Sequence, residues 1–86
     1  MNLLKDNIIP GNYGKVFGTN AVKEGDLLKI RNALYNMSGI KDVDINMEIF
    51  PKEFTIYTSK LVKIEDVENE VQRLGFHIIP KGQFEL

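Results

Sequence analysis

Few side chains in this 86-residue sequence could carry chemistry, and their spacing matches no common catalytic arrangement. There is one histidine, His77, and there is no cysteine, which excludes disulfides, thiolate metal sites and cysteine nucleophiles. No Ser/His/Asp set, phosphate-cradling glycine loop or pair of catalytic carboxylates can be assembled with any specificity. We therefore expect a protein that is not an enzyme and that uses no cofactor.

The remaining candidate ligands favour structural roles. Alternation along residues 76–79 places His77 on the face opposite Phe76 and Ile78, on the open side of a sheet, with no evident partner for metal binding or base catalysis. Met37 and Met47 fall on apolar stripes, so we expect them to fill the core rather than to bind copper.

Composition narrows the class of protein. Hydrophobic residues make up 43% of the chain, and eleven basic side chains against twelve acidic ones give a net charge of −1. A chain of this size supports one domain with a small core. The charge provides no basic field for nucleic acid. No apolar run reaches the roughly 18–20 residues of a membrane span, and the first ten residues do not resemble a secretory signal, so we predict a cytoplasmic protein without a membrane partner.

Two helices are predicted from apolar residues at helical spacing. The first begins between Asn20 and Asp26 and stops near Ser38, because Gly39 suits the position just past a helix end. The second covers residues 64–74 and is closed by Gly75. The apolar stripes consist of Leu27, Ile30, Leu34 and Met37 in the first helix, and of Ile64, Val67, Val71 and Leu74 in the second.

Four strands complete the predicted set. Residues 43–47 alternate between apolar and polar, with a possible extension to Ile49, and residues 54–57 alternate in the same way after a short connection. Weaker signals mark strands at residues 15–19 and 76–79. The order strand, helix, strand, strand, helix, strand predicts an α+β, ferredoxin-like βαββαβ sandwich, with a four-stranded antiparallel sheet and both helices on one face.

The joint order of several short motifs resembles the heavy-metal-associated domain of copper chaperones and metal-transporting ATPases. The motifs are residues 30–34, 37–40, 43–47, 56–57, 62–67 and 74–76. The resemblance implies the same ferredoxin-like fold. We place the domain at residues 14–80, between an N-terminal arm of residues 1–13 and a C-terminal tail of residues 81–86.

The family binds metal through a Gly-Met-x-Cys-x-x-Cys loop before the first helix. Counting back without gaps from Gly39 places the two cysteine positions on Lys23 and Asp26, so no thiolate ligand is present and the resemblance does not imply Cu(I) transfer. Glu24 and Asp26 could hold a hard cation only weakly, because calcium prefers six or more oxygen ligands. We therefore assign no metal ligand.

Three functions stay open. The first is a heavy-metal-associated-like domain without the thiolate ligands that works as a non-catalytic interaction or regulatory module. The second is a genuine metal-binding protein that uses non-cysteine ligands or a site completed across a dimer. The third is a small-molecule-sensing domain that resembles ACT regulatory modules, which share this topology.

Candidate contact residues lie outside the predicted core. Edge strands offer unpaired backbone groups, so a partner protein or a second copy could pair with one of them. The predicted interaction surface consists of Ile49, Phe50, Pro51 and Phe84. Leu3, Leu4, Ile8, Ile9 and Leu86 are further apolar residues in the arms, which we expect to dock rather than to stay disordered.

Two other functions of proteins with this topology each require particular residues. An RNA-binding sheet would need exposed aromatics, for which Phe17, Phe54 and Tyr57 are the candidates, together with a basic surface that the chain lacks. An acylphosphatase would need an arginine in the first loop, whereas Arg31 and Arg73 fall within the predicted helices.

Overall fold

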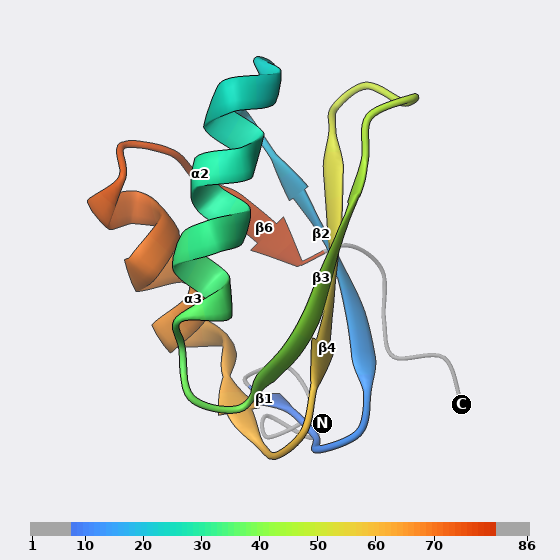
Figure 1. Ribbon diagram of the computed structural model, residues 1–86, viewed down its shortest axis with the longest axis vertical. Helices are drawn as coiled ribbons and strands as arrows, with labels where there is room; N and C mark the ends of the chain where they lie inside the picture. Colours follow the sequence, from blue (N-terminus) through green and yellow to red (C-terminus); the bar gives the residue numbers. More distant parts are fainter. Residues whose placement is uncertain (1–7, 81–86) are drawn as a thin grey trace, which may run out of the picture.

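A computed structural model describes residues 8–80 of the chain. In this part of the chain the protein has two layers. Two helices, α2 (Glu24–Tyr35) and α3 (Ile64–Arg73), cover one face of a sheet (Figure 1). The sheet consists of β2 (Gly14–Thr19), β3 (Ile40–Asn46), β4 (Glu53–Thr58) and β6 (Ile78–Pro80), in the spatial order β3-β4-β2-β6 with every pairing antiparallel. The predicted ferredoxin-like sandwich is therefore confirmed.

The core lies between the sheet and the helices, where the predicted stripes meet. Leu27, Ile30 and Leu34 of α2 and Val67 and Val71 of α3 are completely buried. Phe17 and Phe54 face each other in the pairing of β2 with β4 and are also completely buried. Burying a large apolar side chain stabilises the fold by about 1.5–3 kcal/mol, so these residues supply much of the stabilising free energy.

Both helices end close to the glycines that predicted their ends. Helix α2 stops at Tyr35, three residues before the predicted end at Ser38, and the chain turns through Gly39 at φ +92°. A Cβ at Gly39 would lie 2.8 Å from a methyl carbon of Val62, so both the turn and the close packing require glycine. Helix α3 stops at Arg73, with Leu74 as its C-cap and Gly75 at φ +94°.

A second sheet, which the sequence did not predict, joins the start of the described chain to the start of α3. The strand β1 (Ile8–Ile9) pairs antiparallel with β5 (Val62–Lys63), and Ile9 is completely buried in the main core. The expected docking of the N-terminal arm is thus found for Ile8 and Ile9. Leu3, Leu4, Phe84 and Leu86 lie outside the described residues, and the proposed boundaries at residues 13 and 81 stay predictions.

Three details of the strand predictions were wrong. The strand β3 ends at Asn46, so Ile49 does not extend it, and Met47 lies beyond the strand with 37% of its surface exposed instead of filling the core. Met37, by contrast, packs against the core as expected. The last strand begins two residues later than predicted and ends one residue later, because it includes Pro80, which pairs with Phe17 at an edge where a missing N–H is tolerated.

Candidate functional site

The loop between β2 and α2, residues 20–23, lies where the family resemblance puts its metal ligands. Lys23 is the exposed N-cap of α2, and its carbonyl accepts the Leu27 N–H at 3.0 Å. Asp26 and Glu24 lie in the first turn, where the helix dipole favours negative charge. Within residues 8–80, no three His, Asp or Glu side chains come together as metal ligands, so this loop gives the hard-cation interpretation no support.

This loop is held from both sides by segments distant in the sequence. The Thr19 hydroxyl donates to the His77 carbonyl at 2.8 Å, and the His77 N–H donates to the Asn20 side-chain oxygen at 2.8 Å. The Thr19 N–H donates to the carbonyl of Lys52 in the β3–β4 connection at 3.1 Å. His77 is exposed, but it precedes β6 instead of lying within a strand as predicted, and the backbone of this residue braces the loop.

Beside the loop is an apolar hollow of about 370 Å³, lined by Gly18, Thr19, Asn20, Pro51, His77 and Ile79. Ile79 is 65% exposed on one side of it. Phe50, the neighbour of Pro51, is 80% exposed, and Ile49 is also exposed. We call Ile49, Phe50, Pro51 and Ile79 the apolar end surface. Pro51 and Ile79 both line the hollow, and Ile49 and Phe50 precede Pro51 in the β3–β4 connection, which projects from the sheet (Figure 1). Phe84, the fourth residue of the predicted surface, lies outside the described residues.

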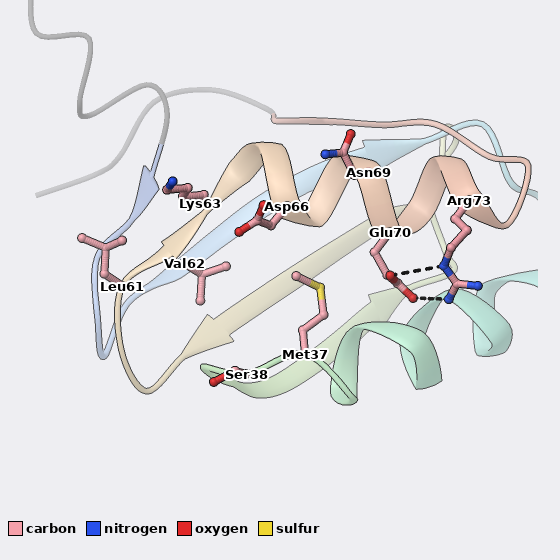
Figure 2. Close-up of a pocket in the computed structure, with 9 residues that line it drawn as sticks. All are labelled: Met37, Ser38, Leu61, Val62, Lys63, Asp66, Asn69, Glu70 and Arg73. Carbon is pink, nitrogen blue, oxygen red and sulfur yellow. Dashed lines mark hydrogen bonds and ion pairs between the residues drawn. The ribbon is translucent and has the colours of Figure 1, made fainter.

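A second hollow of about 560 Å³ lies between α3 and the turn that follows α2 (Figure 2). Its apolar part is formed by Met37, Leu61 and Val62, and polar side chains from α3 form its rim. Glu70 and Arg73 form an ion pair there, which lowers the pKa of Glu70 and raises that of Arg73. With Lys63 and Asp66 the rim carries two charges of each sign and therefore has no net charge.

The face of the sheet away from the helices does not suit base stacking. Phe17 and Phe54, two of the three aromatics considered for that role, are buried beneath the helices. Only Tyr57 is on the open side, and its ring lies over Gly14, where a Cβ would come within 2.8 Å of a ring carbon. Asp42 and Asp44 on the neighbouring strand β3 make this side acidic rather than basic. Of the three aromatics considered, only Tyr57 is therefore placed where a base could stack on this face of the sheet.

Arg31 and Arg73 both lie within helices, as expected, so neither supplies the loop arginine of an acylphosphatase.

In the described part of the chain, no helix is long and apolar enough to cross a membrane.

Comparison with known proteins identifies the fold. No protein-family profile matches the sequence, and no curated protein sequence is similar enough to count as a relative. Among solved structures, the copper(I)-loaded first domain of the human copper chaperone for SOD1 has a TM-score of 0.67 at 17% identity, over 81% of this chain and 93% of that domain. The apo heavy-metal-associated domain of a copper chaperone for superoxide dismutase has a TM-score of 0.68 at 16% identity, over 85% of this chain and 70% of that one.

A third similar structure is a copper-binding domain from HMA7, a P-type ATPase. It has a TM-score of 0.67 at 18% identity, over 81% of this chain and 95% of that domain. The chain therefore has the fold of heavy-metal-associated domains, and the predicted resemblance is confirmed at the level of structure. It has this fold without a single cysteine.

Proposed function

We propose that this protein is a non-catalytic interaction module that binds a partner protein through the apolar end surface. The observation that carries the proposal is the 80% exposure of Phe50 beside a hollow lined by apolar groups. Exposed aromatic side chains next to a pocket are typical of residues that dominate binding energy. A partner that inserts an apolar side chain into the hollow would cover Phe50 and Ile79 at the same time.

The size of the effect follows from the exposed area. Fully burying a phenylalanine side chain is worth about 1.5–3 kcal/mol, and about 1.4 kcal/mol changes an affinity tenfold. Loss of the Phe50 ring should therefore weaken the complex at least tenfold. The same change should leave the fold intact, because the ring contributes little to the core.

Copper carriage by the mechanism of the similar domains is not part of this proposal. Cu(I) needs soft ligands, and the positions that correspond to the family cysteines are Lys23 and Asp26. Nor does any described cluster of His, Asp and Glu favour the alternative of a site with other ligands. Small-molecule sensing also has no specific observation in its favour.

The test places a photo-reactive phenylalanine analogue at position 50, and the control places the same analogue at position 57 in place of Tyr57. Both proteins are expressed in the cytoplasm, where the composition predicts that the protein works. Tyr57 is also an exposed aromatic, but it lies on the open face of the sheet. We expect a partner to be cross-linked from position 50 and not from position 57. The purified partner should then bind the natural chain at least tenfold more tightly than Phe50→Ala. Equal cross-linking from both positions, or equal affinity for the two chains, would refute the proposal.

A further inference from the structure

The edge strand β3 has a feature that bears on whether a second copy can pair with it. It lies at one side of the sheet and, at seven residues, it is the longest strand of the described chain. An edge strand presents unpaired N–H and C=O groups that invite another strand, and proteins commonly block such edges. Whether a second strand can pair with β3 therefore depends on what occupies its outward N–H and C=O groups.

Near the middle of β3, the N–H of Val43 is already engaged by side chains. It donates to a carboxylate oxygen of Asp42 at 2.9 Å and lies 3.4 Å from the Tyr35 hydroxyl oxygen. The Tyr35 hydroxyl donates to the same carboxylate oxygen. This N–H is thus not available to an added strand while Tyr35 and Asp42 remain in place.

The tyrosine is anchored from outside the sheet. Tyr35 is the last residue of α2, and the guanidinium of Arg31, one turn earlier, lies 5.4 Å from the centre of its ring. The register of β3 against β4 also shifts between Ile40 and Asp42, so an irregularity immediately precedes the engaged N–H. Irregularities of this kind turn an edge away from potential partners.

We propose that Tyr35 and Asp42 form a latch that keeps the β3 strands of two copies from pairing, and that releasing the latch makes the protein dimerise through this edge. A second copy is the fitting occupant because an antiparallel pair centred on Val43 is symmetric and extends the same sheet. In that arrangement Asp42 of one copy faces Asp44 of the other, twice over. Like charges directly opposite each other destabilise a strand pair, so the charges add to the protection that the latch gives.

The proposal implies a dependence on pH. The charged groups that act on Asp42 are Arg31 on α2 and Lys41 on β3, and Tyr57 lies opposite it on β4. The hydroxyl of Tyr35, and then the N–H of Val43, lower the pKa of Asp42. Protonation in acid would both loosen the latch and remove the repulsion between the aspartates, so dimers should form at low pH and separate when the pH is raised.

The test combines amide hydrogen exchange with analytical ultracentrifugation of the full chain. Tyr35→Phe removes the hydroxyl and keeps the ring, and Tyr57→Phe is the matched control, because Tyr57 is an equally exposed tyrosine on the adjacent strand. We expect exchange of the Val43 amide to be several-fold faster in Tyr35→Phe than in the control. The double variant Tyr35→Phe with Asp42→Asn should be a dimer at NMR concentrations at neutral pH.

The outcomes separate this proposal from the preceding one. A dimer of the double variant that persists when Phe50→Ala is added supports pairing through β3, whereas a dimer abolished by Phe50→Ala refutes it. Unchanged Val43 exchange in Tyr35→Phe, a monomeric double variant, or a natural chain already paired through β3 at neutral pH would each overturn the latch. None of these results bears on cross-linking from position 50.

Discussion

Replacing Thr58 by valine should destabilise the protein strongly, although the two side chains have nearly the same shape. Thr58 is completely buried at the end of β4. Its hydroxyl donates to the Pro10 carbonyl and accepts the Tyr13 N–H at 3.3 Å, which ties the segment after β1 to the main sheet. The backbone of Thr58 also bonds to Asn12 and Tyr13 at 2.9 Å, so the segment is held along several positions.

The magnitude follows from the groups that lose their partner. Thr58→Val removes the hydrogen bonds of the hydroxyl to the Pro10 carbonyl and the Tyr13 N–H, and at about 0.5–1.5 kcal/mol for each bond the loss should be about 1–3 kcal/mol. At about 4–8 °C per kcal/mol for a domain of this size, the melting temperature should fall by roughly 5–20 °C. Calorimetry or circular dichroism would measure the change.

The matched control for this experiment is Thr55→Val on the same strand. Thr55 lies on the open face of the sheet, between Val16 and Asp44, and is only partly buried. Its replacement should change the stability by no more than about 0.5 kcal/mol. Equal effects of the two substitutions would refute the reasoning, because they would show that the hydroxyl of Thr58 does not fasten the N-terminal segment.

Three further predictions concern the core, the pKa of Asp42 and the positions Lys23 and Asp26. Phe54→Ala should lower the free energy of unfolding by about 3–5 kcal/mol, whereas Phe50→Ala should change it by less than about 0.5 kcal/mol, as measured by urea denaturation; similar losses would contradict the assigned burial. Because the pKa of Asp42 is lowered in the folded state, its ionised carboxylate should stabilise the fold above the unfolded-state pKa. This stabilisation should disappear as the pH falls through the folded-state pKa. An NMR titration that gives Asp42 a pKa at or above its ordinary value would contradict this. The double substitution Lys23→Cys and Asp26→Cys should create Cu(I) binding in a chelator competition, and failure to bind would contradict the assigned positions.

The elements with a strong period were predictable from the sequence. In α3 the apolar stripe of Ile64, Val67 and Val71 is complete, and the observed bounds differ from the prediction by one residue. The weak strands were less predictable, because pairing with neighbours decides their ends. Pro80 marked an end in the sequence, yet it continues β6 because it lies at the edge of the sheet.

The contact surfaces were only partly predictable. Ile49, Phe50 and Pro51 were identified because they are apolar residues outside the predicted core, and the structure places them, exposed, in the β3–β4 connection. Tyr35 and Asp42 were not identified, since their meeting depends on where α2 stops and on the register shift in β3, which no local pattern reveals. The hollow beside α3 likewise depends on how Met37 and Val62 come together from distant segments.

Two hydrogen bonds link His77 with Thr19 and with Asn20, which lie 58 and 57 residues away from it in the sequence. As a result, the loop between β2 and α2 is coupled to the segment that leads into the last strand. Any molecule that displaced residues 20–23 would strain these bonds and pull on the start of β6. A disturbance at one end of the domain would therefore be transmitted to the segment that leads to the C-terminus, and amide shifts in residues 78–80 would report it.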